Sequence, residues 1–388
     1  MPSKVVETEH SVEEPLNCEP DIAELIKNFI TPKGNFYDRN HGPIPHLDGE
    51  THTVQVDGAV ETPIIITVKE LQEKFKSHTV IAALQCAGNR RHTMRTEIKE
   101  VQGIDWSDGA VFNAVWRGPR LCDILNHAKI KLPPDLDWKT NPDAAHVQLA
   151  CYATETQEDN WYGSSIPLAR AMRPEADVIL ALEMNGEPLT PEHGYPIRTV
   201  VPGVAGARSV KWLDRITVST SQSSNFYQVH DYKVLPPEAV DRESAQKFWH
   251  STPPIEDMPV NSIIAVPSSG EKVELDADSK VEVRGYALPK GEDGPVVRVE
   301  VSGDEGETWV DAKLSWGGMD KMEGEGGERL KWAWCLWEAH VVVQPGRGRR
   351  IWSKATDSRG NVQPQEGQWT LRGVCYNAYG EAKDLEVF

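Results

Sequence analysis

The sequence predicts an α+β domain followed by an all-β sandwich of immunoglobulin type. From residue 36 to about residue 227, short β-like runs such as HTVQVDGAV alternate irregularly with short helical patterns such as VKELQEKFK. This mixture is typical of an α+β domain rather than of a regular β-α-β series. After a Pro-rich stretch at residues 232–267, at least five runs of alternating apolar and polar residues follow within about 120 residues, which is the pattern of a sandwich.

The length of the chain predicts its division into domains. Its 388 residues exceed the usual size of one hydrophobic core. We expect residues 1–30 to form an acidic, lightly structured extension, residues 31–250 a mixed α/β domain, and residues 251–388 the sandwich. The boundary falls in the Pro-rich stretch because linkers have this composition.

Composition excludes some partners. The formal charge is 41 − 59 = −18, which disfavours nucleic acid but allows a small anion where arginines converge. No apolar run has the length of a membrane span, so no membrane partner is expected. The six cysteines lie at least 29 positions apart without a CxxC motif, a usage typical of reduced thiols. The N-terminal residues show no leader pattern, so the cytoplasm is the predicted compartment, with the peroxisome and mitochondrion left open.

The segment ALQCAGNRR at residues 83–91 carries the strongest chemical pattern. A β-like run ends at Cys86, and Ala-Gly-Asn then predicts a tight turn whose small residues leave room for a bulky group. We expect the neighbouring Arg90 and Arg91 to lower the pKa of the Cys86 thiol toward the thiolate that a soft metal needs. The alternative is a buried core cysteine beside a structural pair of arginines.

Four blocks in the same order extend this pattern over most of the chain. LQCAGNRR, RNHGPIPHLD at residues 39–48, MNGEPLTPEHGYPIRTVVPGVAGARSVKWL at residues 184–213 and WTLRGV at residues 369–374 together resemble the eukaryotic sulfite oxidase family. The resemblance implies a mixed α/β molybdopterin-binding domain of the sulfite oxidase fold. It also implies an immunoglobulin-like dimerisation domain behind it, and therefore a homodimer.

The resemblance also implies a set of site residues. Molybdenum would be bound by the pterin dithiolene and by Cys86. The positions matching cofactor contacts are Arg39, Asn40, His41, His193, Arg198, Ser209, Val210 and Lys211. The positions matching the substrate pocket are Arg39, Arg91, Trp106, Tyr232 and Arg372, whose guanidiniums and phenol suit a small oxyanion such as sulfite. The chain departs from the family where Thr154 stands in place of an Asp, with Glu155 as a candidate substitute.

The implied reaction is molybdenum-dependent oxidation of sulfite to sulfate. The alternative within the cofactor class is a nitrate reductase-like core, whose relatives carry Asn and Met where this chain has Tyr232 and Arg372. Residues 1–35 contain no His-Pro-Gly-Gly haem motif, so we expect no haem and a likeness to the plant-type, haem-free enzymes. Dioxygen, reduced to hydrogen peroxide, is the expected electron acceptor, and a separate cytochrome is the alternative.

Two other classes of protein are alternatives. A zinc hydrolase would use His41, His46 and His52, but the sequence has no HExxH motif. A non-catalytic interaction protein would explain the sandwich and leave the cysteine block without a purpose.

Overall fold

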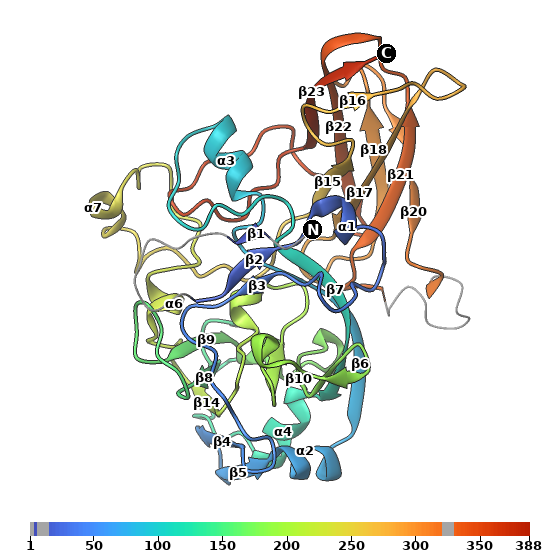
Figure 1. Ribbon diagram of the computed structural model, residues 1–388. Coiled ribbons are helices and arrows are strands. Elements are labelled where there is room, and N and C mark those ends of the chain that lie inside the picture. Colours follow the sequence, from blue (N-terminus) through green and yellow to red (C-terminus); the bar gives the residue numbers. More distant parts are fainter. Residues whose placement is uncertain (1–3, 6–14, 320–329) are drawn as a thin grey trace.

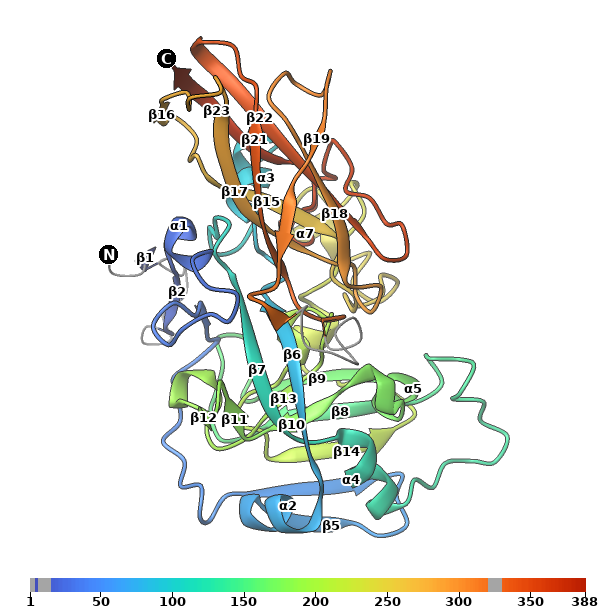
Figure 2. The same cartoon turned by 90° about the vertical axis from the view of Figure 1, so that its right-hand side faces the viewer.

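An α+β domain and a β-sandwich follow one another along the chain, as the sequence predicts (Figure 1). The computed structural model describes residues 4–5, 15–319 and 330–388. In Figure 2 the sandwich stands above the α+β domain, and the long strands β6 and β7 run from the lower part of that domain toward it.

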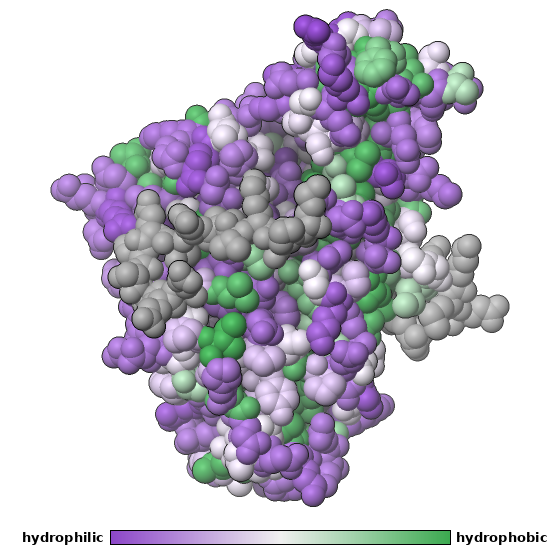
Figure 3. Space-filling model, in the orientation of Figure 1, coloured by the Kyte–Doolittle hydropathy of each residue, from purple (hydrophilic) through white to green (hydrophobic). Residues whose placement is uncertain are grey.

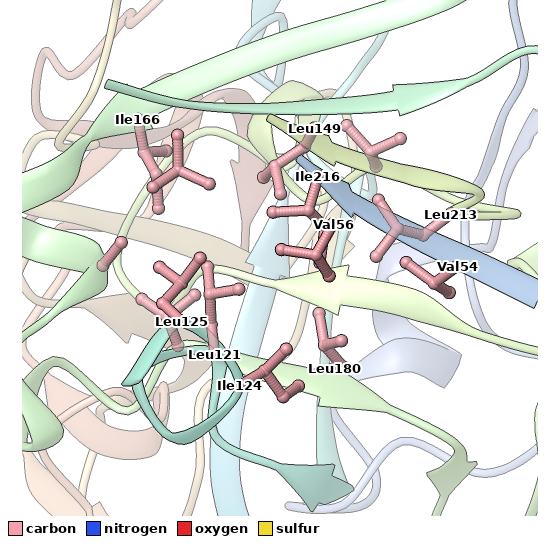
Figure 4. Close-up of a cluster of buried hydrophobic side chains, with 14 of the residues drawn as sticks. Val54, Val56, Leu121, Ile124, Leu125, Leu149, Ile166, Leu180, Leu213 and Ile216 are labelled. Atoms are coloured by element: carbon pink, nitrogen blue, oxygen red, sulfur yellow. The ribbon is translucent and has the colours of Figure 1, made fainter. Parts of the chain in front are cut away.

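One sheet of the first domain builds the larger hydrophobic core. Its strand order is β5-β4-β14-β8-β9, with β14 parallel to β4 and the other pairs antiparallel. The strands are β4 (Thr53–Gly58), β5 (Ile64–Thr67), β8 (His146–Cys151), β9 (Tyr162–Pro167) and β14 (Arg215–Ser219). Helix α4 (Leu121–Ala128) packs against this sheet with Leu121, Ile124, Leu125 and Ala128, which share one helical face (Figure 4).

A second sheet places the cysteine block at the domain boundary. Its order is β12-β11-β7-β6, with strands β6 (Ser77–Gln85), β7 (Val111–Pro119), β11 (Glu183–Met184) and β12 (Glu187–Pro188). Strands β6 and β7 pair from Ser77 opposite Pro119 to Gln85 opposite Val111. The next residue is Cys86, so the sulfur stands where the strand ends. A further pair consists of β10 (Ile179–Ala181) and β13 (Arg198–Val200).

Residues 15–30 pack against the body of the protein, which differs from the lightly structured extension expected from the sequence. Strands β1 (Lys4–Val5), β2 (Asn17–Glu19) and β3 (Asp38–Arg39) form a small sheet, and α1 (Ile22–Leu25) follows β2. Asp21 caps this helix by accepting from two of its backbone N–H groups. Leu25 and Phe29 are buried in one cluster with Ile263 and Tyr286 of the second domain, so burial of these apolar side chains orders the segment.

Two facing sheets form the second domain, which confirms the predicted sandwich. Their orders are β15-β17-β21-β20 and β16-β23-β22-β18-β19. The strands of the first are β15 (Asn261–Val266), β17 (Val281–Leu288), β20 (Lys313–Ser315) and β21 (Cys335–Val341). Those of the second are β16 (Lys272–Val273), β18 (Val296–Ser302), β19 (Val310–Asp311), β22 (Gly346–Asp357) and β23 (Gly380–Val387). Alternate residues of β21 are buried between the sheets, as expected for a sandwich.

Short helices occupy the connections. They are α2 (Val68–Lys74), α3 (Arg91–Glu97), α5 (Leu168–Ala171), α6 (Phe226–Val229), α7 (Arg242–Ala245) and the 3-10 turns η1 (Pro174–Ala176), η2 (Pro191–His193) and η3 (Gly206–Arg208). Among the described residues, none of the helices combines the length and the apolar character needed to cross a membrane. The face shown in Figure 3 is mainly hydrophilic, with hydrophobic residues in small separate areas.

Candidate functional site

Cys86 lies in a tight turn at the end of β6. The backbone N–H of Asn89 donates to the Cys86 carbonyl at 3.0 Å, and the N–H of Gly88 donates to the sulfur at 3.4 Å. The side chain is 5% exposed, and burial raises the pKa of the thiol although Arg91 and Arg39 act against the rise. Arg91 lowers the thiol pKa as expected, but desolvation of the thiolate outweighs this attraction, so the net shift is upward.

Two cavities meet at this sulfur. The first encloses about 760 Å³ of empty space and the second about 1990 Å³, solvent at their mouths included. Four residues line both cavities, namely Arg39, His41, Cys86 and Tyr232. A group held in the first cavity would therefore face a molecule held in the second across Cys86.

The structure brings nearly all of the predicted residues to these cavities. The second cavity is lined by each of the five residues predicted for the substrate pocket, which are Arg39, Arg91, Trp106, Tyr232 and Arg372. The first is lined by seven of the eight residues predicted to contact the cofactor, which are Arg39, Asn40, His41, His193, Arg198, Ser209 and Lys211. Val210 is the exception, because its side chain is buried in the core cluster around Val54 and Val56.

Glu155 does not take the place of the family's Asp, as the sequence had suggested it could. Glu155 is exposed and does not line the first cavity, whereas Thr154 and Thr156 do. The Thr154 hydroxyl donates to the Pro43 carbonyl at 2.8 Å, which leaves its oxygen able to accept a hydrogen bond from a group in the cavity. Thr154, and not Glu155, therefore occupies the position from which the family's Asp would act.

Arg91 lies in a channel formed by glycines from three loops. A Cβ atom on Gly88, Gly103 or Gly373 would come within 2.5, 2.8 or 2.7 Å of its side-chain atoms. Its Nε and Nη1 donate to backbone carbonyls, those of Arg372, Gly373 and Ile104. Burial lowers the pKa of Arg91 to about 10, so the guanidinium stays cationic at neutral pH. Arg91 thus ties the second domain to the cysteine loop while it lines the second cavity.

An ion pair fixes Arg372, the residue contributed by the second domain. Its Nε and Nη2 donate to the two carboxylate oxygens of Asp231, each at 3.1 Å. Burial by itself would raise the pKa of Asp231, but Arg372 holds it below its usual value. Sequence reasoning missed the role of Asp231, although it lies next to Tyr232 in the Asp-Tyr-Lys motif. Its charge next to a predicted anion pocket was the available indication.

Hydrogen bonds also define the tautomer of His41 and the direction in which the Tyr232 hydroxyl donates. His41 Nδ1 lies 3.0 Å from Arg39 Nη2, and Nε2 lies 2.7 Å from the Tyr232 hydroxyl. Burial lowers the pKa of His41 well below 6.5, with Arg39, Lys211 and Arg372 adding to the effect, so the ring is neutral. Since a guanidinium only donates, Nδ1 accepts and Nε2 carries the proton. Nε2 therefore donates to the Tyr232 oxygen, and the Tyr232 O–H is left to donate into the cavity.

Tyr232 stays protonated in this environment. Burial raises its pKa well above 10, although Arg39 acts against the rise. Trp106 offers a second donor, because its Nε1 is buried and has no hydrogen-bond partner among the described residues. The second cavity therefore combines guanidiniums with neutral O–H and N–H donors, the chemistry of an oxyanion site.

The cations that line the first cavity donate their hydrogen bonds to neutral groups. Arg198 donates to three backbone carbonyls and stacks over Trp116 at 5.3 Å. Lys211 donates to the Asn40 side chain and to the carbonyls of Arg39 and Glu192. Burial and neighbouring cations, Arg198 foremost, lower the pKa of Lys211 to about 7. Because carbonyls do not neutralise these charges, the cavity is suited to an anionic ligand.

These features fit a molybdenum cofactor and not a zinc site. Within the described residues no three His, Cys, Asp or Glu side chains cluster as metal ligands, so a metal at Cys86 needs a group that brings further ligands of its own. His41 is hydrogen-bonded to Tyr232, and His52 Nε2 is hydrogen-bonded to the Leu213 carbonyl at 2.8 Å, so the histidines proposed for a zinc site do not form a ligand cluster in the described part of the chain. A thiol on the wall of a cationic cavity is the donor set that a metal carried by an anionic pterin requires.

Neutral buried histidines should make the fold sensitive to acid. Burial lowers the pKa of both His41 and His193 well below 6.5. Below about pH 6.5 the unfolded chain takes up protons that the folded chain does not, so stability falls by about 1.4 kcal/mol per pH unit for each histidine until its folded pKa is reached. Urea unfolding between pH 5 and 7 should show this slope. His41→Gln should remove the part of the slope that His41 contributes. The exposed His340→Gln is the control, and an unchanged slope in His41→Gln would contradict the assignment.

Comparisons with known proteins agree with this geometry. Residues 41–227 match the family described as oxidoreductase molybdopterin binding domain, and residues 252–383 match the Mo-co oxidoreductase dimerisation domain. The sulfite oxidase of Arabidopsis thaliana is 41% identical over 95% of this chain and 91% of its own length. The mitochondrial sulfite oxidase of Homo sapiens is 42% identical over 94% of this chain, which spans 63% of the human protein.

More distant relatives match the chain as well. Nitrate reductase [NADH] 1 of Oryza sativa subsp. japonica is 36% identical over 95% of this chain and 40% of its own length. The crystal structure of the sulfane dehydrogenase SoxCD from Paracoccus pantotrophus superposes with a TM-score of 0.74 at 24% identity, over 98% of this chain and 86% of that chain, and so shares the fold. The family predicted from four sequence blocks is confirmed: the chain belongs to the sulfite oxidase family of molybdopterin-dependent oxidoreductases.

Proposed function

We propose that this chain oxidises sulfite to sulfate with a molybdenum cofactor held at Cys86, and that dioxygen accepts the electrons. The overall reaction, sulfite plus dioxygen plus water giving sulfate plus hydrogen peroxide, balances in atoms and electrons. The observation that carries the proposal is the wall shared by the two cavities, where Cys86 stands with Arg39, His41 and Tyr232.

The residues of the first cavity would hold the cofactor. Cys86 would give a thiolate ligand, since a metal cation replaces the thiol proton even where burial raises the thiol pKa. Arg198 and Lys211 would neutralise the anionic part of the pterin, and the Thr154 oxygen can accept from its ring nitrogens. When bound, the cofactor supplies the two-electron redox centre and the oxygen atom that converts sulfite to sulfate.

The residues of the second cavity would bind and orient the anion. Arg39, Arg91 and Arg372 place positive charge beside Cys86, and their planar donors fix an oxyanion in one orientation. The Tyr232 O–H, left free by the His41 tautomer, donates to one sulfite oxygen. Asp231 keeps the Arg372 guanidinium in place, so the donors are ordered before the substrate arrives.

Sulfite is favoured over nitrate by two positions in this cavity. Tyr232 and Arg372 line it where the nitrate reductases resembled by the sequence carry Asn and Met. A nitrate reductase-like core is the alternative. Dioxygen as acceptor rests on the resemblance of the sequence to the plant-type, haem-free enzymes. A separate cytochrome is the competing acceptor.

One set of measurements on the purified protein tests these statements. We expect about one molybdenum per chain, sulfite-dependent oxygen uptake, and about one hydrogen peroxide per sulfite consumed under air. Sulfite turnover only with added cytochrome c, and without peroxide, would overturn the choice of acceptor. Nitrate reduction with a reduced dye, and no sulfite turnover with either acceptor, would overturn the choice of substrate. Light scattering of the same sample should give the mass of a homodimer, as the dimerisation-domain match supports.

A further inference from the structure

Arg90 points away from both cavities although it precedes Arg91 in the same block. Its side chain is 3% exposed and crosses from the cysteine loop into the second domain. Nη1 donates to Asn261 Oδ1 at 2.9 Å and to the Ala378 carbonyl, and Nη2 donates to the Tyr379 carbonyl at 2.9 Å. The guanidinium also lies 4.9 Å from the centre of the Tyr376 ring. The hydrogen bonds of its Nη atoms therefore go to the second domain, whereas its Nε lies 3.7 Å from Asp108 Oδ1 of the first domain.

Surrounding contacts also fix the backbone conformation at Arg90. Arg90 has φ 67°, a left-handed conformation that non-glycine residues adopt where surrounding contacts impose it, and it directly precedes α3. Helix α3 lies beside the sandwich in both views (Figures 1 and 2). The preceding Asn89 accepts from the Ala110 N–H at 3.0 Å and donates to the Tyr286 hydroxyl at 2.9 Å. The turn after Cys86 is thus tied to β17 by Asn89 and to residues 376–379 by Arg90.

Two carbonyls bonded by Arg90, those of Ala378 and Tyr379, belong to the chain segment that carries Arg372. Residues 370–379 run from the substrate pocket to the carbonyls of Ala378 and Tyr379. Asn261, which accepts from Arg90, also donates to the Tyr376 carbonyl in this segment at 2.9 Å. The Cys375 N–H in turn donates to the Ala87 carbonyl at 2.8 Å, next to Cys86. Arg90 therefore anchors one end of a segment that contacts the cysteine loop at Cys375.

We propose that Arg90 is a positioning residue for substrate binding, which sets the place of residues 370–379 and through them of the Arg372 guanidinium relative to Cys86. The inference rests on the proposed function for the identity of the anion. Lysine at position 90 would keep the charge but would lose the rigid fork that reaches Asn261 and two carbonyls at once. The effect of substitution should therefore appear in anion binding more than in the chemical step.

The experiment compares molybdenum-loaded Arg90→Lys and Asn261→Ala with the unaltered protein. We expect the KM for sulfite and the calorimetric Kd for sulfate to rise about tenfold, with kcat within about threefold and molybdenum content unchanged. Arg170→Lys is the matched control, because Arg170 is also buried and reaches across the domain boundary, to Asp257, but lines neither cavity. It should lower thermal stability without changing either anion constant.

A double-substitution cycle separates positioning from general destabilisation. In an Arg372→Gln background, Arg90→Lys should raise the KM and the sulfate Kd by less than about twofold, because the group it positions is absent. Tenfold effects in both backgrounds, or unchanged anion constants in Arg90→Lys and Asn261→Ala, would overturn the proposal. Sulfate binding could follow this pattern while no protein, the unaltered one included, turns over sulfite. That result would contradict the proposed function and leave the positioning role of Arg90 intact.

Discussion

Cys86→Ser is expected to reduce sulfite turnover by more than about a hundredfold while the protein remains folded. Replacing residues that only support a metal ligand costs about 10- to 100-fold in activity or affinity, so loss of the ligand itself should exceed that range. A serine hydroxyl is a poor substitute, because it is a harder donor and resists deprotonation far more than a thiol. The change of one atom on a cavity wall should leave the core packing intact.

Activity, molybdenum content and circular dichroism of the variant measure this outcome. Cys122→Ser is the matched control, since Cys122 is a buried cysteine of α4 that lines neither cavity. It should keep full turnover with a modest loss of stability. Retention of more than about a tenth of the sulfite turnover by Cys86→Ser would exclude Cys86 as the metal ligand.

Arg372→Gln is expected to raise the KM for sulfite about a hundredfold. Removal of one partner from a charge-assisted contact costs about 2–5 kcal/mol, and a hundredfold change corresponds to about 2.7 kcal/mol. The substitution also leaves the buried Asp231 without its ion-pair partner, which should destabilise the fold by about 3 kcal/mol. The partial exposure of Arg372, 24% of its side chain, places this cost near the lower end of the range for buried pairs.

Asp231→Asn separates the two effects of that substitution. The double variant Asp231→Asn with Arg372→Gln should recover most of the lost stability, because no uncompensated charge remains, but it should keep the high KM. Steady-state kinetics and urea unfolding measure the two quantities separately. Recovery of sulfite affinity in the double variant would show that Arg372 acts on the fold alone.

The contribution of Asp231 to stability should depend on pH in opposite directions in the unaltered protein and in Arg372→Gln. Its folded pKa lies below the unfolded value of about 3.9, so its stabilising contribution is complete above that pH and is lost as the pH falls through the folded pKa. In Arg372→Gln the buried carboxyl keeps the Tyr232 N–H but loses its ion-pair partner, so burial should raise its pKa above the unfolded value. Acid should then stabilise this variant relative to the unaltered protein.

Patterns of neighbouring residues predicted the strands and turns, because these depend on residues that are close together in the chain. The alternating runs after residue 260 gave the sandwich, because residues on a strand alternate between core and solvent. The β-like run before Cys86 and the small residues after it gave the strand end and the turn. Nearly all of the residues that the resemblance of four blocks named line one of the two cavities.

Other features depend on contacts between residues far apart in the chain, and only the tertiary structure decided them. Arg90 and Arg91 are adjacent in one motif, yet one holds the second domain and the other lines the anion pocket. The proton on His41 Nε2 follows from Arg39 and Tyr232 closing around one ring. The direction of the Cys86 pKa shift is set by burial against nearby charge, a balance that residue types do not contain. Sequence alone determined which groups are present, whereas the fold determined their distances and their access to water, on which electrostatic energies depend.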